Sequence, residues 1–224
     1  MKHVPLAIAL AVGLHLACAR PAEPPLAAAP EPQLAPSAPT DTSWTPAHDA
    51  AFAALLAEAG MRFNLPAGFH LTHGADNPAL PYEAALADDG GRLEVRLSLR
   101  PISKVELAFD DPHSSAPEPN HLFAMMFRAV VEQLSPSGIG LESELTPQAL
   151  EPYGASWGAV VVLDLRPEVA GGINQGILLA LHLEDAADAY ALFLPKNLKA
   201  DRDRVDAALR CIGYGPSPTS QVPL

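Results

Sequence analysis

The first 46 residues restrict any globular core to the remainder of the chain. Residues 4–19 form an uncharged, mostly apolar run, and residues 20–46 hold 8 of the chain's 24 prolines. A proline-rich segment with almost no large apolar side chains cannot bury enough surface to fold and instead samples extended conformations. About 170 residues follow, the size of one ordinary domain. We therefore expect a single folded domain over residues 47–214, with a flexible tail at 215–224.

The apolar run has the layout of an export signal. Lys2 precedes it and small residues end it, whereas a membrane-spanning helix needs ~20 apolar residues. The end of the run, Leu16-Ala17-Cys18, resembles the bacterial lipoprotein box, although His15 stands where that family usually has leucine. The resemblance implies that residues 1–18 are a signal peptide whose Cys18 becomes lipidated. Residues 19–46 are then a tether, and Ala19 in place of aspartate favours an outer-membrane lipoprotein facing the periplasm.

A second processing route remains open at this junction. Ala17-Cys18-Ala19 also fits a small-x-small site, and cleavage after Ala19 would release a soluble periplasmic or secreted protein. We favour lipidation because one of only 2 cysteines lies where the lipoprotein box requires it. Cys211 is then left without an intrachain partner, so we expect the domain to be stabilised by its hydrophobic core and not by disulfides.

The charge balance narrows the possible partners. The chain has 14 Lys and Arg residues against 26 Asp and Glu residues, a formal net charge of −12. Its basic residues are scattered, whereas nucleic acids and anionic lipid head groups require clustered basic side chains. We therefore expect no nucleic-acid binding, and membrane attachment only through the lipid anchor.

The sequence after the tether predicts a mixture of helices and antiparallel strands. A helix is expected from Thr45 and Pro46 to Gly60, with Phe52, Leu55, Leu56 and Ala59 facing inward. Strands are expected near 63–69, at 82–87, at 92–100 and at 104–109, with Asp88-Asp89-Gly90-Gly91 as a hairpin turn. Because Leu93, Val95, Leu97 and Leu99 alternate with polar residues, the third strand is expected to be buried on one face and wet on the other.

The C-terminal half continues this pattern. Asn120 is expected to cap a helix that runs to Leu134, with an apolar stripe of Leu122, Phe123, Met126, Phe127, Val130, Val131 and Leu134. A strand is expected at 157–165, and a hairpin joins 176–183 to 190–194. A final helix from Asp201 is expected to place Val205, Ala208, Leu209 and Ile212 inward and to end at Gly213.

This element order predicts an α+β fold with a mainly antiparallel sheet and packing helices. The segment 62–69, with its Leu65-Pro66 and Gly68-Phe69 pairs, resembles the opening of the PsbP/Mog-like and DcrB-like families, and segment 206–214 resembles their terminal helix. The resemblance covers residues 48 to 214 as a pattern of elements. It implies an α/β sandwich that binds partner proteins, with no shared catalytic machinery and no site residue that can be transferred.

One motif points to a different function. Gly154-Ala155-Ser156-Trp157-Gly158 satisfies the G-x-S-x-G pattern of serine hydrolases, and Asp164 and His182 follow in the chain order of that triad. A nucleophile elbow, however, needs a strand before the serine and a helix after it. Here a loop precedes Ser156 and a strand follows it, so we expect Ser156 to be structural.

The sequence evidence for a metal site is as weak as that for a hydrolase. Asp110, Asp111, His113 and His121 cluster around one loop and could hold a cation, but no HExxH, paired-cysteine or EF-hand spacing is present. We expect these side chains to be ordinary exposed loop residues, and we expect no cofactor.

The chain is thus predicted to be a membrane-tethered binding or assembly module of the bacterial cell envelope, acting on an unknown envelope protein. The alternatives are a tethered serine hydrolase using Ser156 and a small-molecule carrier, which would need an apolar cavity between the sheet and the helix at 120–134.

Overall fold

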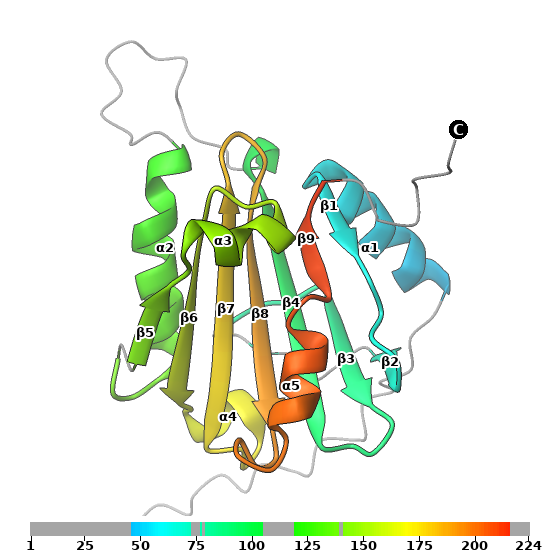
Figure 1. Cartoon of the computed structure of the whole chain (residues 1–224), viewed down its shortest axis with the longest axis vertical. Helices are drawn as coiled ribbons and strands as arrows, with labels where there is room; N and C mark the ends of the chain where they lie inside the picture. The colour runs from blue at the N-terminus through cyan, green and yellow to red at the C-terminus, as the bar shows by residue number, and fades with distance from the viewer. Residues whose placement is uncertain (1–45, 73–76, 78, 105–118, 139–140, 216–224) are drawn as a thin grey trace, which may run out of the picture. The chain divides into compact units, whose positions relative to one another are not determined.

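The computed structural model describes residues 46–72, 77, 79–104, 119–138 and 141–215, all within one compact unit of the chain. This unit is α+β, as the sequence predicts, with a large antiparallel sheet and packing helices (Figure 1). Cys18, the tether, Thr45, Asp110, Asp111, His113 and the tail after residue 215 lie outside the described residues. Among the described helices, none combines the length and the apolar character needed to cross a membrane.

Seven strands form the central sheet in the order β2-β3-β4-β8-β7-β6-β5, and every neighbouring pair is antiparallel. The strands are β2 (Phe69–Thr72), β3 (Ala84–Asp88), β4 (Leu93–Pro101), β5 (Leu141–Glu144), β6 (Trp157–Asp164), β7 (Gln175–Leu183) and β8 (Ala187–Pro195). The predicted hairpins β3-β4 and β7-β8 are confirmed. Local turn chemistry explains this success, since Gly91 and Asp185 both adopt the positive φ that tight turns require.

Helices and a small second sheet cover the two faces of the large one. One face packs against α1 (Pro46–Glu58), α5 (Arg202–Ala208) and the two-stranded sheet of β1 (Met61–Phe63) and β9 (Ile212–Tyr214). The other packs against α2 (Pro119–Leu134) and the short helix α4 (Pro167–Ala170). The result is a three-layer arrangement with a separate apolar core on each side of the sheet (Figure 1).

Helix α2 spans the predicted residues, but two details differ. Met126, which the sequence places in the apolar stripe, is 47% exposed, whereas Phe123, Phe127, Val131 and Leu134 are buried. Asn120 lies inside the helix and does not cap it. Its side-chain amide bonds Asp185, donating to Oδ1 at 2.9 Å and accepting from the backbone N–H at 3.0 Å. The start of α2 is thereby tied to the turn between β7 and β8.

The prediction that β4 has a wet face is wrong. Arg96 and Ser98, on the polar side of the strand, are both buried. Arg96 Nη1 donates to the Val169 carbonyl of α4 at 2.7 Å, and Ser98 Oγ donates to the Pro81 carbonyl at 2.8 Å. The segment before β3 and helix α4 cover this face, and they supply the acceptors that buried polar groups need. The strand predicted at 104–109 lies almost wholly outside the described residues; Ile102–Lys104 form a 3-10 turn.

The predicted C-terminal helix is also too long. Helix α5 ends at Ala208, and Ile212–Tyr214 form strand β9, paired with β1 in the register Met61↔Tyr214 to Phe63↔Ile212. Tyr214 donates from its hydroxyl to the carbonyls of Leu181 and Ala187, and the Arg62 guanidinium donates to the carbonyls of Tyr214 and Pro152. Pairing with a strand about 150 residues earlier therefore outweighs the local helical pattern. An open groove lies beside this segment.

Candidate binding groove

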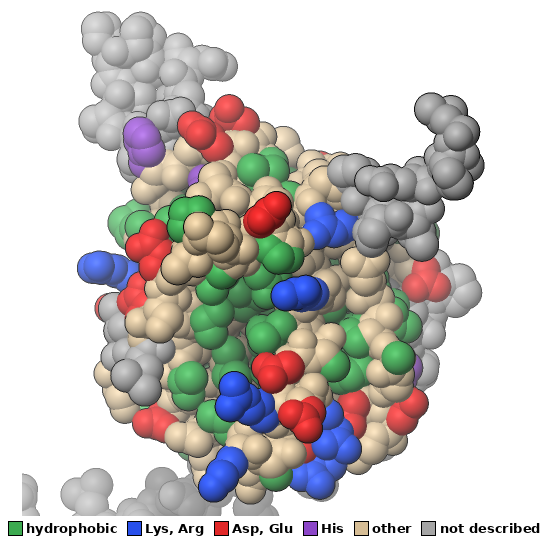
Figure 2. All heavy atoms as spheres, viewed as in Figure 1, with side chains coloured by type: hydrophobic (Ala, Val, Ile, Leu, Met, Phe, Trp, Pro, Cys, Tyr) green, Lys and Arg blue, Asp and Glu red, His purple; other side chains and the backbone are tan. Residues whose placement is uncertain are grey.

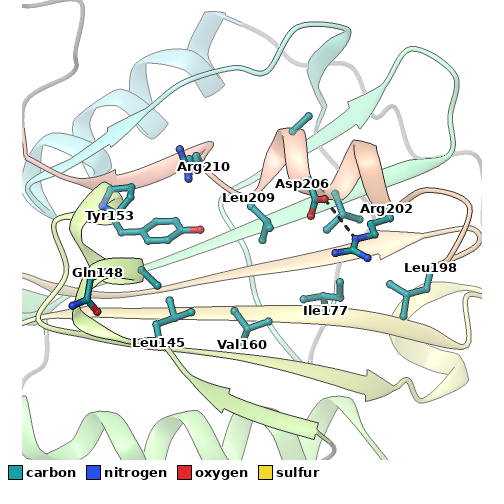
Figure 3. A pocket seen from close by; sticks show the side chains of 14 residues that line it. Leu145, Gln148, Tyr153, Val160, Ile177, Leu198, Arg202, Asp206, Leu209 and Arg210 are labelled. Carbon is teal, nitrogen blue, oxygen red and sulfur yellow. Dashed lines mark ion pairs between the residues drawn. The ribbon is translucent and has the colours of Figure 1, made fainter.

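An open groove of about 700 Å³ lies over the sheet where its covering layer is incomplete. Its floor is formed by β6 and β7, and its two sides by α5 and by the turn region of α3 (Pro147–Leu150) and η2 (Glu151–Tyr153). Figure 3 shows Val160 and Ile177 on the floor, with Tyr153 at one side and Leu209 opposite. Helix α5 lies along the direction of the strands beside this floor, so Val160 and Ile177 are left uncovered between α5 and the α3–η2 turn region (Figure 3).

The groove is mainly apolar. The aliphatic side chains of Leu145, Val160, Ile177 and Leu209 are only half-buried, although each packs against the core on this side of the sheet. Figure 2 shows this surface as a hollowed hydrophobic patch over the strands. Half-buried aliphatic groups gathered in one concavity are a feature of interaction and ligand sites, whereas isolated surface leucines are not.

Basic side chains line both ends of the groove although the protein is acidic overall. Arg202 and Arg210 line the groove itself, and the adjoining shallow basin, which shares Leu198 with it, contains Lys196 and Lys199. Arg202 pairs with Asp206 at 3.7 Å (Figure 3), while Lys196, Lys199 and Arg210 have no ion-pair partner among the described residues. Among the described residues that line the groove and the basin, the acidic ones are Asp164 and Asp206. This surface therefore favours a ligand that is apolar and negatively charged.

Tyr153 supplies a polar group beside Arg210, at the end of the groove away from Arg202 and the basin. It is mostly buried, and burial raises the pKa of its phenol, while the nearby positive charge of Arg210 acts in the opposite direction. The phenol is therefore neutral across the physiological range and can donate a hydrogen bond.

The structure brings Ser156 next to His182, whose carbonyl accepts a hydrogen bond from the Ser156 backbone N–H at 2.9 Å, but the two side chains bond other groups and Asp164 lies far from both. Ser156 is exposed just before β6, and its Oγ accepts a hydrogen bond from the backbone N–H of Glu184 at 3.0 Å. His182 bonds Asp188 instead, with 2.7 Å between Nδ1 and Oδ1, and stacks on Phe123. Asp164 lies at the far end of β6, seven residues beyond Trp157, the partner of His182 in the register. At ~3.3 Å per residue this is more than 20 Å away.

The two glycines of the G-x-S-x-G segment have structural roles. Gly154 has a φ of 63°, and a Cβ on it would lie 2.9 Å from the Tyr214 carbonyl oxygen. Gly158 lies inside β6, where a Cβ would meet Leu150 at 3.0 Å and the Ala180 carbonyl oxygen at 3.1 Å. Both positions are tight because η2, β9 and α3 press against the sheet at the start of β6.

We expect Gly154→Ala to destabilise the domain by about 1 to 2 kcal/mol more than Gly60→Ala. The two glycines have the same φ of 63°, so the backbone strain of an alanine is matched, but nothing lies within 4 Å of a Cβ on Gly60. The difference measures the contact with Tyr214. Urea unfolding of both variants provides the comparison, and equal midpoints would show that β9 does not pack closely against Gly154.

Metal and thiol chemistry have little support in the described part of the chain. Of the four candidate ligands only His121 is described; it is exposed in the first turn of α2. No group of three or more His, Cys, Asp or Glu side chains suited to a metal occurs among the described residues. Cys211 is a buried free cysteine, and burial raises the pKa of its thiol to about 12. It is therefore protonated and unreactive at neutral pH.

Fold and groove together define a class: an α+β domain with a seven-stranded antiparallel sheet and an open apolar groove on one face. Comparison with protein-family models, curated proteins and solved structures gave no match for this chain. The groove residues were missed by the sequence analysis. Their aliphatic character predicts burial, and no local pattern reveals that the helices of this layer leave them uncovered.

Proposed function

We propose that this protein is an exported binding module, anchored to the bacterial cell envelope through Cys18, and that the groove over β6 and β7 holds a segment of a partner protein. The observation that carries the proposal is the concavity of half-buried aliphatic side chains on a sheet face that the domain itself leaves uncovered. Small-molecule sites usually enclose most of their ligand. An open groove contacts one side of its ligand, which suits a chain segment lying along it.

The charges around the groove indicate the composition of that segment. An extended peptide with two or three aliphatic side chains would fill the floor near Val160 and Ile177. An acidic residue at one end would meet Arg202 and the two lysines of the basin. Exposed ion pairs of this kind contribute little free energy but orient the partner and raise the association rate.

Selection of displayed 12-residue peptides against the full chain tests the groove. We expect enrichment of sequences that combine aliphatic and acidic residues, and at least tenfold weaker binding of the selected peptides to Ala207→Trp. Ala207 is exposed and lines the groove, so a bulky side chain there obstructs the site without entering the core. Ala54→Trp, on the exposed surface of α1, is the matched control. Peptides that bind wild type and Ala207→Trp equally would contradict the proposal.

The anchor has its own test. Metabolic labelling with a fatty acid is expected to mark the wild-type protein and to be lost in Cys18→Ala. An unlabelled wild-type chain that begins at Arg20 would show that the signal is cleaved after Ala19 and that the protein is released.

A further inference from the structure

The hydroxyl of Tyr153 is a free hydrogen-bond donor that opens into the groove. Only 8% of the residue is exposed, so packing fixes the ring, and Figure 3 shows the hydroxyl directed into the groove over its floor. It has no hydrogen-bond partner among the described residues, and it is not one of their inaccessible polar atoms. A ligand oxygen that lies on the floor can therefore reach it.

The end of the groove beside Tyr153 carries a positive charge and no negative one. Arg210 and Gln148 line this end, and neither side chain has a partner among the described residues. The acidic residue of the groove, Asp206, instead pairs with Arg202 at the other end. A guanidinium beside a phenol and a carboxamide offers several N–H and O–H donors to one ligand group. A carboxylate suits this set, because it accepts hydrogen bonds on both oxygens and brings the opposite charge.

The two arginines of the groove set the distance between its basic ends. Arg202 begins α5, and Arg210 follows the last residue of that helix, Ala208, at the opposite end of the groove (Figure 3). At ~1.5 Å per residue, the two arginines are separated by roughly 12 Å along the groove. Two residues about four positions apart in an extended peptide are separated by about 13 Å. A segment with acidic residues at that spacing therefore reaches both ends.

We propose that the groove recognises an extended segment in which two acidic residues, about four positions apart, flank an aliphatic one, and that Tyr153 and Arg210 bind one of the two carboxylates. The other carboxylate meets Arg202 and the two lysines of the basin. Alternate residues of an extended segment point to the same side, so the aliphatic residue between the acids faces the floor. This inference rests on the proposed function, and it adds the spacing of the ligand and a residue, Tyr153, that determines specificity.

Fluorescence anisotropy of the full chain with three labelled peptides tests the spacing. The spaced diacid contains Glu-Val-Leu-Val-Glu. The permuted diacid, Glu-Glu-Leu-Val-Val, has the same composition and charge, and the monoacid is Glu-Val-Leu-Val-Gln. We expect the spaced diacid to bind about fivefold more tightly than either of the others, because it alone places a carboxylate at each end of the groove.

Variants at the Tyr153 end test which residues produce this gain. Tyr153→Phe and Arg210→Gln should each remove the gain of the spaced diacid over the monoacid and leave binding of the monoacid unchanged. Tyr153→Phe removes only an unpartnered hydroxyl, so the fold is expected to remain intact. Arg128→Gln, on the exposed surface of α2, removes the same charge as Arg210→Gln and should keep the gain.

The outcomes separate this inference from the proposed function. A spaced diacid that binds no more tightly than the permuted one, or a gain that survives in Tyr153→Phe, would overturn the inference and leave the groove as a peptide site. If the three peptides do not bind, or bind wild type and Ala207→Trp equally, the proposed function and this inference are both wrong.

Discussion

Replacing Phe127 with alanine is expected to lower the free energy of unfolding by about 3 to 5 kcal/mol. Phe127 is 2% exposed at the centre of α2, where it stacks on Phe123 and meets the Trp157 ring edge-on at 5.8 Å. The substitution removes a buried aromatic ring and leaves a cavity that the rigid sheet cannot close. Such a loss is a large share of the stability of an ordinary domain.

Urea unfolding of the full chain, followed by circular dichroism, measures this effect. Met125→Ala is the matched control, because Met125 precedes Phe127 on the same helix but is 59% exposed. Its expected change is within about 0.5 kcal/mol. If Phe127→Ala and Met125→Ala unfold at the same urea concentration, α2 does not pack on the sheet as described.

The second large effect is expected at Asp88, whose carboxylate organises the hairpin between β3 and β4. It is buried, and it accepts hydrogen bonds from the backbone N–H groups of Arg92 and Leu93 and from the guanidinium of Arg204. Burial raises the pKa of this carboxyl group, but the two backbone hydrogen bonds and Arg204 outweigh burial and hold the pKa below its usual value. The ionised form is therefore the one that stabilises the fold.

Asp88→Asn is expected to cost about 2 to 3 kcal/mol near neutral pH, because charge-assisted hydrogen bonds are lost. A carboxyl group whose pKa is lower in the folded state contributes stability above its unfolded pKa of about 4, and this contribution disappears as the pH falls through the folded value. The difference between wild type and Asp88→Asn should thus be largest at pH 6 to 7 and should shrink below pH 4.

Unfolding free energies measured from pH 7 down to pH 3 test this dependence. Asp89→Asn is the control, since Asp89 is the next residue in the same turn but its carboxylate is exposed and pairs with the exposed His70 at 3.2 Å. A cost at Asp88 that stays constant over the whole pH range would mean that the charge of the carboxylate plays no part, and that its shape alone matters.

The sequence by itself determined those helices and hairpins whose apolar pattern and turn residues lie within a few positions of each other. The hairpin turns at Asp88-Asp89-Gly90-Gly91 and near Asp185, and the apolar stripe of α2, are of this kind, and together they predicted the α+β class. The spacing of apolar residues and the residue types in a turn are local properties of the chain, so they can be recognised without knowledge of the fold.

The tertiary structure alone decided the features that depend on contacts between distant residues. Strand β9 forms because β1 is available to pair with it, and Arg96 and Ser98 are buried because α4 and the segment before β3 cover them. The groove exists because α5 on one side and the α3–η2 turn region on the other leave Val160 and Ile177 uncovered. Each feature is set by how far a neighbouring element extends over the sheet, which no local pattern in the chain specifies.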